Sequence, residues 1–379
     1  MEYIALKDVC KINMGQSPDS SSYNDNEDGI PFFQGNADFG EKYPVTRVWC
    51  NAPIKIAQPE DILISVRAPI GALNFAKEEC CIGRGLAALT PDRSKVSLEF
   101  IYWLLKGKKV ELNSKGTGST FKAISRKVLE ETTVPAIDFY KQHEYAESLE
   151  KIYNVIQKRK EELSALDDLI KARFVEMFGN PLDGTAKYPI HQVGNVAEAV
   201  DPQPSHRTPP IQEGGIPYVS IKDCDYITGK IDFEGARKVA RKVLEEHLNR
   251  YTMHDGDFVI GKIGTIGNPV FIPVRDDYTL SANVVLVQPN SEVVSPYFLK
   301  YSFESDFVER QFSEAKNSTS QAAFGIQKVR NVKVMNPDLD TQRVFEKFVK
   351  QVDKSKVAVQ KALDETQLLF DSLMQEYFG

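Results

Sequence analysis

The stretch EDILISVRAPIG, from Glu60 to Gly71, returns late in the chain as GDFVIGKIGTIG, from Gly256 to Gly267. Both copies have Asp at the second position, Ile at the fifth and Ile-Gly at the end, without a gap. A short apolar run bounded by Gly and Pro predicts a buried strand followed by a turn. Because twelve residues can match by chance, the repeat has to be followed along the rest of the chain.

The match extends in the same order through both halves of the 379 residues. The further pairs are Gly29–Phe32 with Gly215–Tyr218, Val96-Ser97 with Val294-Ser295, Phe100 with Phe298, Ile124 with Ile326, Pro135 with Pro337, Tyr145 with Phe345, and Phe178-Gly179 with Phe378-Gly379. The largest insertion, ARKVARKVLEEHL at residues 236–248, predicts a short helix in the second half. A repeat this long indicates two domains of one fold and not a solenoid.

Each half follows one plan, which predicts an α+β fold. The segments in order are a short amphipathic opening (4–12 and 193–200), a polar Pro/Ser-rich loop, short β segments, a helix (98–110 and 296–312), a polar loop, a β-like segment ending at Pro135 or Pro337, and one long helix. We therefore expect a tandem duplication of an α/β domain that is followed each time by a long helix.

Both long helices carry apolar residues at alternating spacings of three and four, which is typical of a coiled coil. The inward candidates are Tyr145, Leu149, Ile152, Ile156, Arg159, Leu163, Leu166, Ile170, Arg173 and Met177 in the first, and Phe345, Val349, Val352, Lys356, Val359, Leu363, Thr366, Phe370, Leu373 and Tyr377 in the second. The alternative is that each helix lies on its own domain. The polar interruptions fall at different places in the two seams, which favours pairing of the two helices with each other.

The length of the linker predicts the direction of that pairing. Each helix has roughly 40 residues and is about 60 Å long, whereas a linker of about ten residues reaches at most about 35 Å. The chain cannot return to the start of the first helix, so we expect an antiparallel coiled coil with the two domains at its opposite ends. The predicted boundaries are 1–138 and 189–340 for the domains, 139–179 and 341–379 for the helices, and 180–188 for the linker.

Composition and cysteine usage narrow the class of protein. The chain is 42% hydrophobic and 26% charged, which is ordinary for a globular protein, and its net charge of −6 gives no global sign of a polyanionic partner. Its five cysteines form no C-x-x-C pair, so we expect no disulfide framework or zinc site and a reducing cytoplasm. The start of the chain lacks the pattern of a signal peptide, and no apolar stretch approaches the length of a membrane span.

Catalytic signatures are missing from the sequence. It contains no P-loop, no H-E-x-x-H and no G-x-S-x-G motif, and its five histidines have no ligand spacing, so we expect neither a metal nor another cofactor. Asp306, Glu314 and Lys316 could be drawn as a nuclease-like cluster, but the equivalent loop of the first half lacks the acidic pair. A solvated helix face is the better interpretation, and the chain is predicted to be a binder and not an enzyme.

Basic residues gather locally in both halves. They are Lys106, Lys108, Lys109, Lys115, Lys122, Arg126 and Lys127 in the first, and Arg237, Lys238, Arg241, Lys242, Arg250, Lys262, Lys316, Lys328 and Arg330 in the second. Such clusters are often solvated faces. Interleaved with Ser, Thr, Asn and Gly, they also suit contacts to phosphate groups, where short hydroxyls and backbone N–H groups help lysines to position a duplex.

The paired order of motifs resembles the specificity subunits of type I restriction-modification systems over essentially the whole chain. The motifs that carry the resemblance are GIPFFQGNADFG, EDILISVRAPIG, CIGRGLAALTP and KGTGSTFKAISRKVLEETTVP before a long helix, with the counterparts of these segments in the second half. The resemblance implies a noncatalytic subunit whose two target-recognition domains each read half of a bipartite, asymmetric DNA site. It also implies that the helices set the spacing and bind two adenine-methyltransferase subunits, which restriction subunits join for cleavage.

The candidate DNA-binding residues follow from their chemistry. Arg pairs with guanine, and Asn or Gln pairs with adenine, through two hydrogen bonds. The candidates for base contacts are Gln34, Asn36, Arg67 and Arg84 in the first domain and Lys222, Lys262, Thr265 and Asn283 in the second; further DNA-binding candidates are Lys108, Lys115, Lys122 and Lys316. The alternative is that some of them only hold loops, since Asn36 and Asn283 also suit turns. Because NSTSQAAFGI replaces KGTGSTFKAI and Lys262 stands in the place of Val66, the two domains are expected to read different sequences.

Two other functions remain open on the sequence. A fused nuclease-methyltransferase fragment would need a glycine motif for S-adenosylmethionine and an N-P-P-Y-type adenine motif, and neither is present. A coiled-coil adaptor for proteins would need no affinity for DNA. Salt-dependent binding of a DNA duplex separates the adaptor from a DNA-reading subunit.

Overall fold

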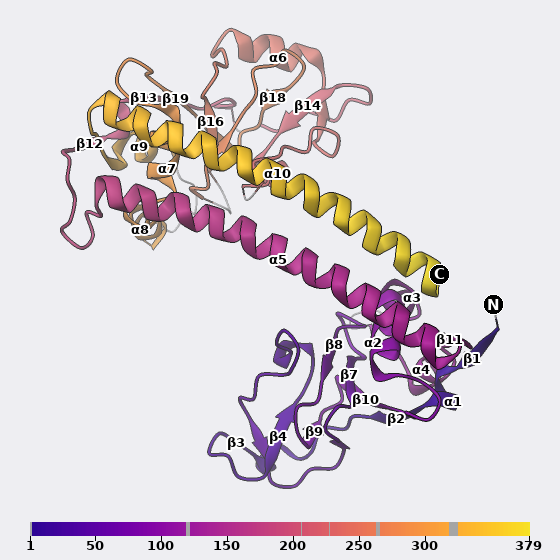
Figure 1. Cartoon of the computed structure of the whole chain (residues 1–379). Helices are drawn as coiled ribbons and strands as arrows, with labels where there is room; N and C mark the ends of the chain where they lie inside the picture. Colours follow the sequence, from indigo (N-terminus) through magenta and orange to yellow (C-terminus); the bar gives the residue numbers. More distant parts are fainter. Residues whose placement is uncertain (1, 119–121, 206, 227, 263–265, 318–324) are drawn as a thin grey trace. The chain divides into compact units, whose positions relative to one another are not determined.

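The computed structural model describes residues 2–118, 122–205, 207–226, 228–262, 266–317 and 325–379. The chain forms two compact units, Met1–Lys160 with Lys361–Gly379 (unit 1) and Glu161–Gln360 (unit 2). The two long helices are α5, Phe139–Phe178, and α10, Leu339–Phe378 (Figure 1). Each unit therefore contains one sheet-bearing domain together with part of α5 and part of α10.

Unit 1 is built on three sheets. A four-stranded antiparallel sheet has the order β2-β10-β7-β8, a five-stranded sheet has the order β3-β5-β4-β9-β6, and β1 pairs with β11. The strands are β1 Tyr3–Ala5, β2 Cys10–Met14, β3 Tyr23–Asn24, β4 Ile30–Phe33, β5 Trp49–Cys50, β6 Ile56–Ala57, β7 Ile62–Ser65, β8 Leu73–Phe75, β9 Cys80–Ile82, β10 Leu86–Pro91 and β11 Thr133–Pro135. The apolar run of β7 is fully buried, as the sequence predicts.

Unit 2 repeats this topology. Its four-stranded sheet has the order β13-β19-β16-β17, β14 lies between β15 and β18, and β12 pairs with β20. The strands are β12 Ile190–Gln192, β13 Ala197–Val200, β14 Ile216–Val219, β15 Lys238–Val239, β16 Phe258–Gly261, β17 Val270–Phe271, β18 Thr279–Leu280, β19 Val284–Pro289 and β20 Lys333–Met335. In both units the strand from the opening motif, β7 or β16, is central in its sheet, and β4–β9 and β14–β18 are parallel pairs. The duplication is confirmed.

The buried Asp that the two copies share caps the turn before this strand. Asp61 Oδ2 accepts from the backbone N of Gln58 at 2.9 Å, and Asp257 Oδ2 accepts from that of His254 at 2.8 Å. A carboxylate that accepts a backbone N–H satisfies a buried donor where the strand begins. The matching aspartates of the opening motif are thus explained by their structural role.

The short helices correct two sequence predictions. The helix predicted over 98–110 is broken at Lys108, and the one predicted over 296–312 is broken at Glu304-Ser305. A Cβ at Gly107, just before the break at Lys108, would lie 2.8 Å from Met374 Cε, the flexible end of a side chain of α10. The insertion at 236–248 forms the strand β15 before its helix. The helices are α1 Leu6–Val9, α2 Leu98–Gly107, α3 Lys109–Ser114, α4 Arg126–Glu130, α6 Arg241–Leu248, α7 Pro296–Phe303, α8 Asp306–Asn317 and α9 Ile326–Asn331.

A buried glutamine fastens each long helix to its domain. Gln142 Oε1 accepts from the backbone N of Ser97 at 2.8 Å, and Gln342 Oε1 accepts from that of Ser295 at 2.7 Å. The two serines cap α2 and α7, and the glutamine Nε2 groups donate to the backbone carbonyls of Ile137 and Pro337. This pair was not predicted from the sequence, although the two glutamines stand at matching places in the repeat.

The contacts within each unit show that α5 and α10 run antiparallel. In unit 1 the rings of Tyr145 and Tyr377 stack 3.7 Å apart, so the start of α5 meets the end of α10. In unit 2 Phe178 packs 5.5 Å from Phe345, so the end of α5 meets the start of α10. All the predicted inward residues are buried or half-buried. The seam and its direction are confirmed, and the placement of the two domains at opposite ends stays a prediction.

Candidate nucleic-acid interface

Backbone hydrogen bonds join the loops that follow β2, β4, β7 and β9 into one continuous edge of unit 1. The loop edge of unit 1 is defined by residues 15–17, 34–35, 66–68, 83–85 and 122–124. Its bonds run from Gln16 N to Ile82 O (3.0 Å), Gly83 N to Phe33 O (2.8 Å), Gly85 N to Gln34 O (3.1 Å), Val66 N to Gly85 O (2.9 Å) and Ile124 N to Val66 O (2.9 Å). Segments far apart in the sequence are thereby held as one surface.

Glycine makes this close packing possible. A Cβ at Gly15 would lie 2.2 Å from Gly83 O, and one at Gly85 would lie 2.4 Å from Gln34 O. Real side chains do not make such contacts, so these loops approach backbone to backbone only because they lack side chains there. The G-R-G sequence at residues 83–85 therefore presents the Arg84 side chain between two glycines that seat the loop.

The loop edge brings together four predicted residues of the first domain. The side chains of Gln34, Arg67, Arg84 and Lys122 belong to it, and all four are exposed. Ser17, which the sequence analysis missed, connects two of them: its Oγ lies 3.0 Å from Gln34 Nε2 and 3.1 Å from Gln34 Oε1, and accepts from Arg84 N at 3.3 Å. Asn36 is half-buried and begins a short 3₁₀ turn, Asn36–Asp38, next to this edge.

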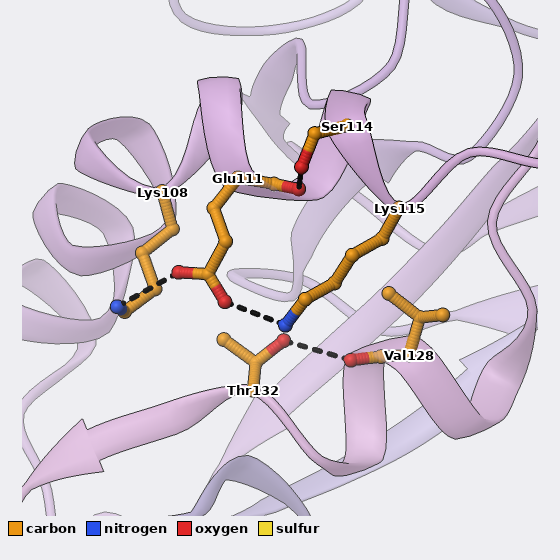
Figure 2. Close-up of polar contacts among 6 residues, drawn as sticks. All are labelled: Lys108, Glu111, Ser114, Lys115, Val128 and Thr132. Carbon is orange, nitrogen blue, oxygen red and sulfur yellow. Dashed lines mark hydrogen bonds and ion pairs between the residues drawn. The ribbon is translucent and has the colours of Figure 1, made fainter.

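Lys115 extends the basic surface from the loop edge to α3. The backbones of Thr117 and Ala123 exchange two hydrogen bonds of 2.9 Å, and Ala123 forms a bridge with Arg67. The segment that contains Lys115 and Gly116 is thereby tied to Lys122, whose Cβ would lie 3.4 Å from a Cβ at Gly116. Lys108, Glu111 and Lys115 form a small charged cluster on this helix (Figure 2).

One lysine of the first basic cluster turns inward. Lys106 Nζ lies 3.5 Å from the centre of the Tyr153 ring and 4.7 Å from that of Trp103. Burial lowers the pKa of Lys106 to about 8. This ammonium group stabilises the packing of α2 on α5 through cation–π contacts and does not belong to the exposed basic surface.

Unit 2 repeats the backbone of the loop edge with different side chains. Ser281 N donates to Val219 O, and Lys262 N donates to Asn283 O, both at 2.8 Å, as Gly83 and Val66 do in unit 1. Asn283 is exposed at this edge, whereas Lys262 is only 5% exposed. Lys262 Nζ instead donates to Asp201 Oδ2 at 2.8 Å.

The ion pair changes the interpretation of Lys262. No local sequence pattern indicates that Asp201, 61 residues earlier, neutralises this charge. The structure places the ammonium group in a buried pair because an unpaired charge there would be strongly unfavourable. A DNA contact of Lys262 stays a prediction, and its observed partner is a carboxylate of the same unit.

A polar network continues from this pair through unit 2. Gln203 Oε1 lies within hydrogen-bond distance of His247 Nε2, and His247 Nδ1 lies 2.7 Å from Thr279 Oγ1. Gln203 Nε2 also donates to Ser205 Oγ at 2.8 Å, so the network holds the loop after β13. Burial lowers the pKa of His247 below its usual range. This network was not predicted from the sequence. The one available signal was that His247 belongs to the insertion that is specific to the second half.

The remaining candidates of the second domain are dispersed. Lys222 is exposed in the 3₁₀ turn Ile221–Asp223. Lys316 lies in α8, and Thr265 lies outside the described residues. Three basic residues of the second cluster, Arg237, Lys238 and Arg330, donate to the backbone carbonyls of Pro209, Phe233 and Ala199. These three side chains hold loops of unit 2, and a phosphate contact of the second basic cluster stays a prediction.

The described residues of the two loop edges offer hydrogen bonds and charge. Across the ranges given above, no group of three or more His, Cys, Asp or Glu could hold a metal ion. The five cysteines are buried and free, and burial raises the pKa of Cys10, Cys80 and Cys224 to about 12. Such thiols are inert as nucleophiles at neutral pH. No described helix is long and apolar enough to cross a membrane.

Comparison with known proteins identifies the family. The type I restriction modification DNA specificity domain matches residues 1–165 and again residues 187–366. The chain belongs to this family. The resemblance seen in the paired motifs is thereby confirmed, and each of the two matches contains one of the loop edges described above.

Individual relatives carry the same type of name. A Methanocaldococcus jannaschii protein assigned as the MjaX type I restriction enzyme specificity subunit is 45% identical over 152 residues, 40% of this chain and 36% of the relative. The chain thus matches little more than a third of that relative. The type I restriction enzyme EcoBI specificity subunit of Escherichia coli is 20% identical, over 99% of this chain and 85% of its own length.

A solved structure agrees with the fold of the whole chain. The S subunit of the type I restriction-modification system of M. genitalium has a TM-score of 0.58 and 15% identity, covering 100% of this chain and 96% of that one. At this identity the likeness shows the fold alone. It supports the arrangement of two similar domains, each with a long helix.

Proposed function

We propose that the chain is the noncatalytic subunit that gives a type I restriction-modification complex its DNA sequence specificity. Each unit reads one half of a bipartite, asymmetric site in double-stranded DNA. The observation that carries this proposal is the loop edge, which has one backbone pattern in both units and different side chains in each. Two copies of one scaffold with different polar groups can read two different half-sites.

The long helices are proposed to bind the partner subunits. Val357 and Leu368 on α10 and Leu169 on α5 are exposed apolar residues that lie outside the inward seams of these helices. Exposed apolar side chains on a helix suit a protein partner. We propose two methyltransferase subunits as those partners, with restriction subunits joining the complex, so that the chain directs adenine methylation or cleavage. The buried free thiols fit a reducing cytoplasm, which is the proposed location.

Purification of the chain with and without its partner tests this function. Alone, the chain is expected neither to methylate nor to cut DNA, because the proposed subunit is noncatalytic and the chemistry belongs to its partners. Adenine methylation should appear when a separate subunit that binds S-adenosylmethionine is added. Activity of the chain alone would contradict the proposal. Binding of protein partners without any salt-dependent binding of DNA would instead support a coiled-coil adaptor.

A further inference from the structure

Glu111 stands between two lysines at the end of the basic surface in unit 1 (Figure 2). Its Oε1 lies 2.6 Å from Lys115 Nζ and its Oε2 lies 3.0 Å from Lys108 Nζ. The hydrogen bond from Lys115, assisted by Lys108, holds the pKa of Glu111 below its usual range. The carboxylate is therefore ionised at neutral pH and accepts from both ammonium groups.

The two lysines differ in their access to solvent. The Lys108 side chain is 12% exposed, whereas that of Lys115 is 44% exposed. Lys108 therefore holds Glu111 from the protein side, and Lys115 is the lysine that an incoming phosphate can reach. A phosphate contact of Lys108 stays a prediction.

Glu111 is a single negative charge in a stretch of positively charged residues. It is the only acidic residue between Ile101 and Lys127, a stretch with seven lysines and arginines. Gly116, the residue after Lys115, packs against Lys122, and Thr117 pairs with Ala123, which also bridges to Arg67. The backbone at Lys115 therefore borders the loop edge. A carboxylate at this place presents to Lys115 the same kind of charged oxygen that a DNA phosphate would present.

We propose that Glu111 competes with DNA phosphate for Lys115 and thereby limits the sequence-independent affinity of the chain for DNA. This inference rests on the proposed function. Neutralising a phosphate releases condensed counterions, so each available cation strengthens binding to any duplex. A lysine that is already paired contributes less of this term. Glu111 thus reduces the time spent on non-target DNA without touching a base.

The test is Glu111→Gln in the full-length chain, with a short duplex of random sequence as the probe. The amide keeps the size of the side chain and removes its charge. Freeing about one phosphate-binding cation should make the slope of log K against log salt concentration more negative by about 0.9. The loss of affinity between about 50 mM and about 200 mM salt should therefore be about 3.5-fold larger than for the natural chain.

Two further variants make the outcome specific. Glu147→Gln removes an equal charge from α5, where Glu147 pairs with Lys151 at 2.6 Å, and should leave the slope within about a third of the Glu111→Gln change. Adding Lys115→Gln to Glu111→Gln should return the slope to that of the natural chain. Equal effects of Glu111→Gln and Glu147→Gln, or weaker DNA binding by Glu111→Gln, would overturn the inference. If the natural chain binds no duplex in a salt-dependent way, the proposed function itself fails.

Discussion

The two units differ most clearly below their loop edges. In unit 2 the ion pair Asp201–Lys262 lies beneath the edge. By strand register, Met14 of unit 1 corresponds to Asp201, and Val66 corresponds to Lys262. The backbone bond of Lys262 to Asn283 repeats that of Val66 to Gly85. One scaffold thus accepts either two apolar side chains or an ion pair, provided that both positions change together.

The largest expected effect comes from breaking this pair on one side. Lys262→Met leaves Asp201 without its partner, and removing one member of a buried pair typically costs about 3–5 kcal/mol of the free energy of unfolding. The double variant Asp201→Met with Lys262→Val copies unit 1 and should recover most of that stability. Urea unfolding of the full chain measures both. Equal stability of the single and the double variant would contradict the comparison.

The double variant also decides what Lys262 does. Because it restores a folded unit 2 without the lysine, its DNA preference can be compared with that of the natural chain. If Lys262 reads a base, the double variant should relax one position of the second half-site, with a change of about 1–3 kcal/mol at that base pair. If it acts only through the ion pair, the preference should stay as it is. Binding to a set of duplexes with single base changes measures this.

The buried glutamines Gln142 and Gln342 test whether matching hydrogen bonds contribute equally to the stability of the two units. Gln142→Ala and Gln342→Ala each leave a buried backbone N–H, that of Ser97 or Ser295, without its acceptor. An unsatisfied buried donor costs about 1–3 kcal/mol. We expect the two variants to lower the free energy of unfolding by similar amounts, as measured in urea. As a matched control, Gln351→Ala on the exposed side of α10 should change stability little. If only one of the two variants lowered the free energy of unfolding strongly, the equivalence of the units would be contradicted.

The smallest expected effect is a pH dependence confined to unit 2. His247 has a folded pKa below its usual value, so the unfolded chain binds the proton more readily. The contribution of neutral His247 to the free energy of unfolding is therefore fully present above the unfolded pKa of about 6.5, and it is lost as the pH drops below that value. His247→Gln should make the free energy of unfolding decrease less between about pH 7 and about pH 5.5. Urea unfolding at each pH measures this. Stability that falls equally in the variant would assign the dependence to groups other than His247.

The repeat and the heptad seams could be predicted from sequence because they depend on patterns that recur. Buried strands such as β7 and β16 need apolar runs, and a coiled coil needs apolar residues at alternating spacings of three and four. The candidate site could be predicted only in part. Gln34, Arg67 and Arg84 were found by their chemistry, and the loops that carry them lie together in the structure.

What could not be predicted depends on partners far apart in the chain. The separation of Asp201 from Lys262 and of Ser17 from Arg84 leaves no local signal of contact. Charge alone also misled, since Lys106 packs on aromatic rings and Arg330 donates to a backbone carbonyl. A basic residue reads the same in sequence whether it contacts solvent, a ring or a loop.

The central claim is that the two loop edges read separate half-sites, and a map of methylated adenines tests it most directly. The host genome is mapped at single-molecule resolution with the natural chain, with Arg67→Ala and with Asn283→Ala. Both side chains are exposed at the loop edges of their units. The account predicts that Arg67→Ala relaxes or loses one half of the methylated site, that Asn283→Ala affects only the other half, and that the spacing between halves stays constant. If either variant changes bases in both halves, or if both variants change the same bases, the division of the reading between the two units is contradicted.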